Sequence, residues 1–454
     1  MCCPRRRSLR ARSVPSSKKA PLSIPIGSTG RASRLFPRAI RPVSWPKRST
    51  APARGTSRAE DALRIGFLVS HPIQYFAPLF RELAKHCDLT VFYAHRQTAE
   101  QQARAGFDVA FEWDVDLLSG YHSKFLRNVA RAPSTDRFFG CDTPEIAGEI
   151  AGGSFDGFVV PGWALRTYWQ AVQACRRAGV PVFVRGDSQL VGPRSGAVRL
   201  AKAMAFRGVL RRFDGFLYVG QRNRDYLLHY GAPSQRLFFS PHCVDNDAFK
   251  AASEAARRDP PSRDALGRDP IPTRRVLFAG KLIERKRPLD VLQAAARLAA
   301  DGNPVDVAFA GSGDQQDALT AAAAASGVRA HFHGFVNQSE LPGIYAAADV
   351  IVLPSDGRET WGLVVNEAMA CGVPAVVSDA VGCGPDLIEA GVTGAVFPLG
   401  NVAALADGIA EVLAFDRART RQALAERMET YSPARAAQGI AGAASALKSQ
   451  SRTE

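Results

Sequence analysis

Residues 349–379, which read DVIVLPSDGRETWGLVVNEAMACGVPAVVSD, decide the fold of this chain. An apolar run at 350–353 ends at a proline, a polar loop carries Glu359, and a second apolar run at 375–377 follows the turn at Gly372. Neither run alternates between polar and apolar residues, which is typical of parallel strands buried on both faces. Because such crossovers are right-handed, we expect the loop and the helix start at the carboxyl edge of the sheet, where open α/β sheets bind ligands.

Two glutamates, Glu359 and Glu367, stand in this stretch with seven residues between them, in the frame PS…ETWG…NEAMACGVPAVVSD. The frame resembles the signature of the retaining glycosyltransferases of family 4, which have the GT-B fold. Gly362 matches the glycine after the first glutamate, and Gly372 with Pro374 match the turn after the second. Without the frame, the two glutamates would read as an exposed loop carboxylate and a solvated helix position, since charged side chains are mostly exposed.

Length and composition indicate a soluble globular protein with two or three domains. The chain has 454 residues, of which 46% are hydrophobic and 22% charged, close to ordinary values. It has no run near the ~20 apolar residues that span a bilayer, so any membrane contact should be peripheral. The eight cysteines form no C-x-x-C pair, which suits reduced thiols in a cytoplasmic protein and predicts no metal site. The expected location is the cytoplasm, with or without peripheral contact at the inner membrane face.

The net charge of +15 comes from one end of the chain. Fifteen lysines and arginines lie between Arg5 and Arg58, before the first acid, Glu60, and the remainder has 43 basic and 43 acidic residues. The folded part therefore lacks the basic footprint of a nucleic-acid-binding domain. Residues 1–61 should form a disordered basic tail; an organelle transit peptide and a start codon assigned too early, with the natural protein beginning near Leu63, are alternatives.

Apolar strands alternate with helices along the rest of the chain, which predicts an α/β fold with two Rossmann-like domains. The resemblance implies that they face a cleft, as in GT-B proteins. We expect the boundaries to be an acceptor-side domain over 62–249, a linker over 250–273, a nucleotide-sugar-binding domain over 274–431, and a helix within 432–454 that returns to the first domain. The basic, partly amphipathic segment 197–213 could touch anionic lipid or be an ordinary solvated helix.

The segment GKLIERK, residues 280–286, follows the first strand of the second domain. It resembles the family's Gly-Arg-Leu…Lys segment, whose two cations hold the donor diphosphate, so the resemblance assigns Lys281 and Lys286 to that clamp. Lysine at position 281 keeps the positive charge but lacks the bidentate fork of the usual arginine. The charge is needed because a departing nucleoside diphosphate becomes more negative.

By the same resemblance, Glu367 would accept hydrogen bonds from the ribose, and Glu359 would hold the transferred sugar. Further donor contacts are implied from the glycine turns and the start of the helix, namely Gly280, Gly311, Gly334, Phe335, Gly362, Leu363 and Val364. We identify no nucleophile for double displacement, which favours a front-face mechanism assisted by the leaving phosphate. Such a scheme needs no metal and no cofactor beyond a UDP-, GDP- or ADP-linked sugar as co-substrate.

The first domain offers weaker candidates at its strand ends. His71, Gln74 and Tyr75 could bind acceptor or donor phosphate, or could form an ordinary helix entry. Many relatives carry a histidine at the end of a later strand, but here that region presents Trp163. Arg185 and Asp187, also at a strand end, are either site residues or a structural ion pair.

The leading function is transfer of a sugar from a nucleotide-diphosphate donor to a hydroxyl of a glycan or lipid-linked acceptor. A non-catalytic nucleotide-sugar-binding or scaffold protein on the same fold is the alternative. A Rossmann oxidoreductase fits poorly, because the turn Gly311-Ser312-Gly313 has Gln316 where the third glycine of the dinucleotide motif belongs.

Overall fold

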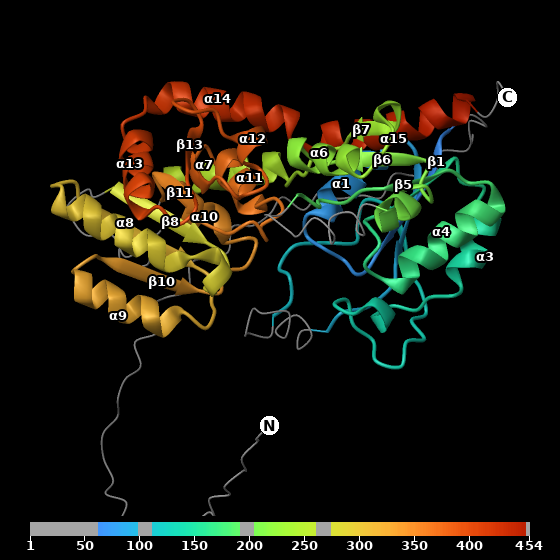
Figure 1. Cartoon of the computed structure of the whole chain (residues 1–454), viewed down its shortest axis with the longest axis horizontal. Coiled ribbons are helices and arrows are strands. Elements are labelled where there is room, and N and C mark those ends of the chain that lie inside the picture. The colour runs from blue at the N-terminus through green and yellow to red at the C-terminus, as the bar shows by residue number, and fades with distance from the viewer. Residues whose placement is uncertain (1–61, 99–110, 191–203, 260–273, 451–454) are drawn as a thin grey trace, which may run out of the picture. The chain divides into compact units, whose positions relative to one another are not determined.

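The computed structural model describes residues 62–98, 111–190, 204–259 and 274–450 (Figure 1). The predicted tail over 1–61 and part of the segment 197–213 therefore lie outside the described residues. Among the described helices, none is both long enough and apolar enough to cross a membrane.

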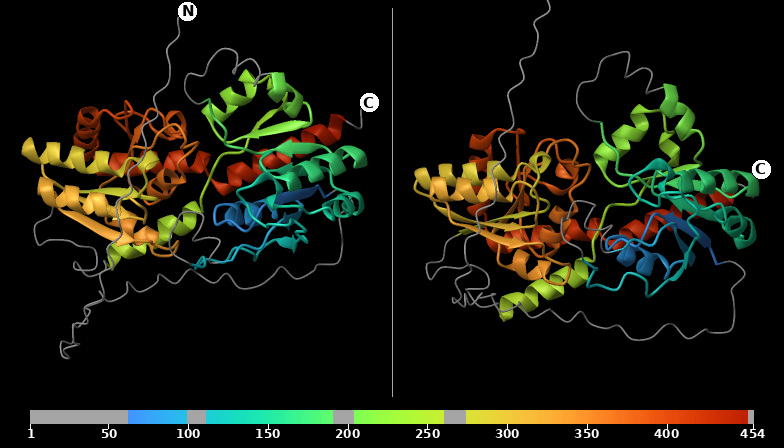
Figure 2. Two further views of the ribbon diagram at one scale, coloured as in Figure 1. Left: turned by 60° about the horizontal axis from the view of Figure 1, so that its bottom comes forward. Right: turned by 90° about the horizontal axis from the view of Figure 1, so that it is seen from below.

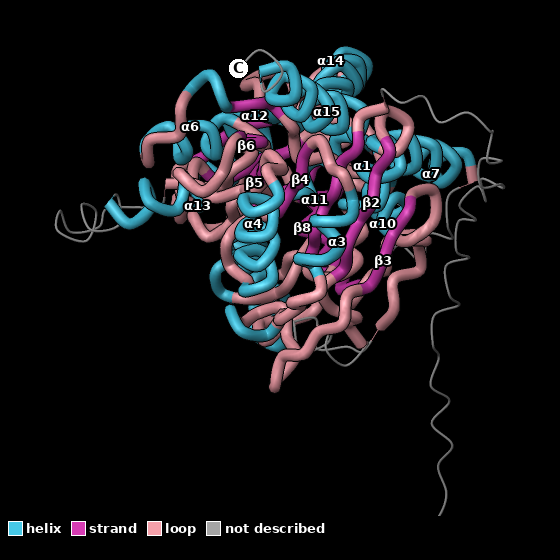
Figure 3. Tube along the Cα trace, turned by 90° about the vertical axis from the view of Figure 1, so that its right-hand side faces the viewer, coloured by secondary structure: helices cyan, strands magenta, loops and turns pink. Residues whose placement is uncertain are grey.

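The first domain is built on a seven-stranded parallel sheet of order β3-β2-β1-β4-β5-β6-β7, whose central strands lie side by side in Figure 3. Its strands are β1 (Arg64–Val69), β2 (Asp88–Tyr93), β3 (His122–Phe125), β4 (Gly157–Val160), β5 (Val182–Val184), β6 (Gly215–Tyr218) and β7 (Leu237–Phe239). Its described helices include α1 (Phe76–Leu83), the short η2 (Phe138–Gly140), α3 (Ile146–Gly153), α4 (Arg166–Ala178), α6 (Gln221–His229) and η3 (Ser234–Arg236).

The second domain contains a six-stranded parallel sheet of order β10-β9-β8-β11-β12-β13. The strands are β8 (Arg274–Ala279), β9 (Val305–Ala310), β10 (Ala330–Gly334), β11 (Val350–Leu353), β12 (Ala375–Ser378) and β13 (Gly394–Phe397). The helices are α7 (Asn246–Arg258), η4 (Glu284–Lys286), α8 (Pro288–Ala300), α9 (Gln316–Ser326), α10 (Leu341–Ala346), α11 (Leu363–Ala370), α12 (Gly384–Leu387), α13 (Val402–Leu413) and α14 (Arg417–Thr430).

The central strands of both sheets are buried on two faces, which explains their unbroken apolar runs in the sequence. In β1, Phe67 packs into the core under α1, whereas its neighbour Leu68 packs into the core under α3 and α4. In β8, Leu277 faces the core with α11, and Phe278 faces the core with α8 and α13. The predicted α/β fold with two Rossmann-like domains is confirmed.

Helices α15 and α7 each pack against one of the two domains. The last helix, α15 (Pro433–Gln450), packs on α1 and β7 of the first domain, as the sequence predicts (Figure 1). Residues 250–258, which the sequence assigns to the linker, instead form most of α7, which packs on α10 and α11 of the second domain (Figure 2). Asp245 caps this helix by accepting a hydrogen bond from the Ala248 amide, and the buried Phe249 anchors it to the second domain's core.

Replacing either of two glycines with alanine should change the stability of the protein, in opposite directions at the two positions. Gly179 ends α4 with a φ of +69°, whereas Gly148 lies on the exposed side of α3, and a Cβ at either position would meet nothing within 4 Å. Gly179→Ala should destabilise the protein by about 1–2 kcal/mol because of backbone strain. Gly148→Ala should stabilise it by up to about 1 kcal/mol through helix propensity. Thermal unfolding should show midpoints shifted in opposite directions; equal shifts would contradict the conformations assigned here.

Candidate active site

Three predicted glycines lie together where β8, β9 and β10 end. The Gly311 amide donates to Gly334 O at 2.7 Å, and the Gly280 amide donates to Ala310 O at 2.8 Å. Gly311 has a φ of +147°, and a Cβ there would lie 1.9 Å from Gly280 O. Only glycine fits this position, so the end of β9 presents bare backbone.

Two of the three residues predicted to be catalytic, Lys286 and Glu359, meet above this backbone. Lys286, at the end of η4, forms an ion pair with Glu359, and the two side chains are only 12% and 15% exposed. A Cβ on Gly280 would lie 3.8 Å from Lys286 Nζ, so the ammonium group lies directly over the glycine turn. Lys281 lies in the same turn and is partly buried. A basic group and a carboxylate thus share one enclosed position at the ends of β8 and β11.

The loop that carries Glu359 is held by its own backbone. The Glu359 amide donates to Asp356 O at 2.9 Å, and its carbonyl accepts from the Gly382 amide at 3.0 Å. Helix α11 then begins at Leu363, after Gly362 with a φ of +108°. Leu363 and Val364 form its first turn and pack partly against the core. The helix start therefore lies where the motif predicts it.

Glu367 is not the solvated carboxylate that a lone helix position would suggest. It is 1% exposed and accepts hydrogen bonds from Tyr345 Oη at 2.6 Å and from Gln338 Nε2 at 3.4 Å. Burial raises its pKa, while the hydrogen bonds from Tyr345, Gln338 and Tyr75 oppose that rise. Because Tyr75 comes from the first domain and packs against the second domain's core, it lies beside the proposed donor site.

The other candidates at the end of β1, His71 and Gln74, are partly buried and have hydrogen-bond partners of their own. His71 Nδ1 lies 2.9 Å from Ser70 Oγ, and burial together with the neighbouring His95 lowers the pKa of His71 to about 4. Gln74 hydrogen-bonds Tyr75. His71 is therefore neutral at pH 7 and cannot supply a positive charge for a phosphate.

The buried histidines predict a pH dependence of stability. Burial also lowers the pKa of His333 to about 4. Since both folded-state pKa values lie below the unfolded value near 6.5, the unfolded chain binds more protons, and stability present above pH 6.5 is lost as the pH falls toward 4. At pH 5 each histidine should cost about 2 kcal/mol. Denaturant unfolding at pH 7 and pH 5 measures this, and His71→Asn should reduce the pH effect by about 2 kcal/mol; an unchanged effect would contradict the burial of His71.

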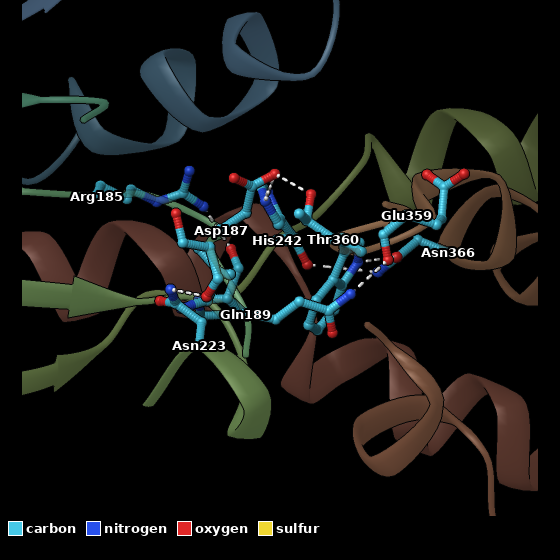
Figure 4. Close-up of polar contacts among 12 residues, drawn as sticks. Arg185, Asp187, Gln189, Asn223, His242, Glu359, Thr360 and Asn366 are labelled. Atoms are coloured by element: carbon cyan, nitrogen blue, oxygen red, sulfur yellow. Dashed lines mark hydrogen bonds and ion pairs between the residues drawn. The ribbon is translucent and has the colours of Figure 1, made fainter. Parts of the chain in front are cut away.

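Asp187 and Arg185 do not form the alternative ion pair. Arg185 is 4% exposed and donates to Ser240 Oγ at 3.1 Å and to Pro241 O at 2.7 Å, a structural role. Asp187 accepts from Thr360 Oγ1 at 2.8 Å, and His242 Nε2 lies 3.9 Å from the same oxygen (Figure 4). The Asp187 side chain is 49% exposed, so it remains accessible to a ligand next to the Glu359 loop.

Gln189 holds the Glu359 loop, Arg222 holds the loop after β12, and neither residue was predicted from the sequence. Gln189 Nε2 donates to Gly357 O at 3.0 Å and to Glu359 O at 3.1 Å (Figure 4). Arg222 Nη1 donates to Ala380 O at 3.1 Å. Both residues belong to the first domain and bind backbone carbonyls of the second, so each ties one loop of the second domain to the first.

Two candidates have surroundings that differ from the predicted ones. Trp163 packs against the first domain's core, with its ring 5.2 Å from that of Phe206. Phe335, one of the donor contacts that the resemblance implies, has its ring 4.2 Å from that of Phe111 in the first domain. The sequence analysis did not identify Tyr345 and Gln338 as partners of Glu367. They lie outside the motif, and no spacing rule connects them to it.

Comparison with known proteins matches this architecture. Residues 270–431 match the model of the family described as glycosyl transferases group 1. A D-inositol 3-phosphate glycosyltransferase of Mycobacterium sp. (strain JLS) is 37% identical over 208 residues, which cover 45% of each chain. A GDP-mannose-dependent alpha-(1-6)-phosphatidylinositol monomannoside mannosyltransferase of Mycobacterium tuberculosis (strain ATCC 25618 / H37Rv) is 31% identical over 47% of this chain and 57% of its own. The chain thus spans about half the length of these relatives.

Solved structures show the same fold. Anabaena HepE in complex with UDP superposes with a TM-score of 0.62 at 18% identity, over 85% of this chain and 100% of its own. Sucrose-phosphate synthase of Thermosynechococcus elongatus gives a TM-score of 0.58 at 20% identity, over 86% and 98%. The predicted GT-B fold is confirmed.

Proposed function

We propose that the protein is a retaining glycosyltransferase, since residues 270–431 match the model of the group 1 glycosyl transferases. It moves a sugar from a nucleotide-diphosphate donor to a hydroxyl of a glycan or lipid-linked acceptor. The observation that carries the proposal is the enclosed Lys286–Glu359 pair over the glycine turn at the ends of β8 and β9. Names of the matched relatives support the donor class, since one is GDP-mannose-dependent.

The diphosphate binds to Lys281 and Lys286 in this proposal. Lys286 lies over Gly280 with only 12% of its side chain exposed, so its charge acts in a medium of low dielectric constant, where it is worth more than in water. The bare backbone at Gly311 lets a phosphate approach closely. The first turn of α11 adds backbone N–H groups. These groups meet the charge that develops on the leaving diphosphate, and no metal is required.

Glu359 holds the transferred sugar and stabilises positive charge at its anomeric carbon. Its ion pair with Lys286 places the carboxylate next to the phosphate clamp, which is where the bond to the leaving group breaks. With no second carboxylate assigned as nucleophile, the leaving phosphate takes the proton of the incoming hydroxyl on the same face, and configuration is retained. Asp187 and Thr360, which hydrogen-bond each other beside the loop, orient the acceptor.

Glu367 binds the ribose of the donor. An ionised carboxylate has about four acceptor positions, of which Tyr345 and Gln338 use two. Tyr75 takes a third, so the ribose either shares Glu367 with Tyr75 or displaces it. Of the two alternatives that the sequence left open for Tyr75, acceptor or donor, this arrangement favours the donor side.

A ligand screen tests the proposal. UDP, GDP and ADP, compared with NAD in parallel, should include at least one nucleoside diphosphate that raises the unfolding temperature, because a ligand of the folded state stabilises it. The matching nucleotide sugars should then release diphosphate when glycan or lipid-linked acceptors are added. Stabilisation by NAD alone would contradict the proposal, and binding without transfer to any acceptor would favour a non-catalytic binding protein.

A further inference from the structure

A cavity of about 110 Å³ lies at the other edge of the second sheet from the candidate active site. Asp349 and Pro374, which precede β11 and β12, form part of its wall, together with the end of α13 and the start of α14. Four arginines line it: Arg257, Arg274, Arg417 and Arg421. The proposed donor site uses the carboxyl ends of these strands, so the cavity is a separate place in the domain.

The positive charge in this cavity exceeds the negative charge. Among the described residues that line it, Asp349 is the single carboxylate. Asp349 Oδ1 pairs with Arg274 at 3.4 Å and also with Arg417, while Oδ2 accepts the Arg275 amide at 2.8 Å. One carboxylate therefore lies among four guanidinium groups. It forms ion pairs with Arg274 and Arg417, but not with Arg257 or Arg421.

Arg257 and Arg421 lie close to each other. Arg257 Nη2 donates to Cys371 O and Nη1 to Ser253 Oγ at 3.4 Å, which fixes the group beside the turn after α11. Burial lowers the pKa of Arg257, and the nearby charge of Arg421 lowers it further. Arg421 lies over the turn, since a Cβ on Gly372 would be 3.4 Å from its Cγ. No hydrogen bond or ion pair joins Arg421 to the described residues. Two positive charges in one cavity repel each other, and this repulsion costs free energy. A bound anion would attract both charges and offset that cost.

We propose that this cavity binds a phosphate-class oxyanion, either free phosphate or the phosphoryl group of a small metabolite, with Arg421 and Arg257 as its main ligands. Guanidinium groups match phosphate oxygens through two parallel N–H bonds. The cavity is several times larger than the roughly 10–15 Å³ that one water needs, so an oxyanion fits. Because its residues come from α7, α14 and the turn after α11, a bound anion connects three elements and should stabilise the domain.

Thermal unfolding of the full chain in orthophosphate, with chloride at equal ionic strength, tests the site. The unfolding temperature should rise with phosphate beyond the effect of chloride. Arg421→Ala should lose at least half of that rise and weaken apparent phosphate affinity about tenfold, the scale of a charge-assisted hydrogen bond. Arg421→Lys should retain part of it. Arg297→Ala, which removes an exposed arginine of α8, is the matched control and should keep the whole rise.

Two further arms separate the sources of phosphate. Repeating the series in a Lys286→Ala background removes the donor clamp, and the part of the rise that depends on Arg421 should remain. Glucose 6-phosphate, compared with glucose and orthophosphate, reports whether a phosphorylated metabolite binds more tightly than the free ion. Equal effects of phosphate and chloride, or an undiminished rise in both Arg421 variants, would overturn the proposal whether or not the protein transfers sugar.

Discussion

Glu359→Gln is expected to lower kcat about hundredfold while leaving the affinity for nucleoside diphosphate nearly unchanged. The substitution keeps the shape of the side chain but removes its charge, which the proposal uses only where positive charge develops on the sugar. Calorimetric titration with the diphosphate, beside the turnover rate, measures both quantities. Thermal unfolding checks that the variant remains folded.

Glu367→Gln is the matched comparison, because it makes the same change eight positions along the chain. This carboxylate is buried and accepts hydrogen bonds from Tyr345 and Gln338, and the proposal places it on the ribose. Its loss should therefore weaken nucleoside diphosphate and sugar donor alike. If Glu359→Gln loses nucleotide and Glu367→Gln loses only turnover, the two roles are exchanged.

Lys286→Ala should lower kcat/KM for the donor about hundredfold. It removes the cation that lies over Gly280 and leaves Glu359, only 15% exposed, without its ion-pair partner. Both consequences cost free energy, because a charge-assisted contact is lost and an enclosed carboxylate is left uncompensated. Lys281→Ala, which removes the second cation of the clamp, should cost about tenfold. Steady-state kinetics over a range of donor concentrations measures these ratios.

Two controls make the lysine result specific. Lys250→Ala removes a lysine from α7, outside the site, and should leave kcat/KM unchanged. The double variant Lys286→Ala/Glu359→Gln should lose less than the product of the two single losses, because groups in contact are not independent. Unchanged kinetics in a folded Lys286→Ala protein would show that the diphosphate binds elsewhere.

The sequence predicts the strands of the second domain well because they are buried on both faces and bounded by glycine and proline turns. The same logic fails for α7. Its residues Glu254, Arg257 and Arg258, followed by prolines, resemble a solvated linker, yet Phe249, Ala252 and Ser253 are buried on one side of a helix. Asp245, which caps the helix, is a residue type that indicates a helix start. The polar composition of the residues that follow favours a linker instead.

Within the candidate site, the motif predicts which residues lie on the loop and the helix but not what they contact. The pairing of Glu359 with Lys286 follows from two adjacent strand ends, β8 and β11, so it was within reach of topology. The bonds from Gln189 and Arg222 end on backbone carbonyls, and no side-chain pattern records such partners. Tyr75 reaches Glu367 through packing between domains, which a single-domain pattern does not contain.

The most direct test of retaining glycosyl transfer is the anomeric configuration of the product, read by proton NMR on the donor found in the ligand screen. An α-linked donor should give an α-linked product, with one nucleoside diphosphate released for each sugar transferred and neither product formed by the Lys286→Ala/Glu359→Gln variant. A β-linked product from the same donor, or full activity in that double variant, would contradict the account.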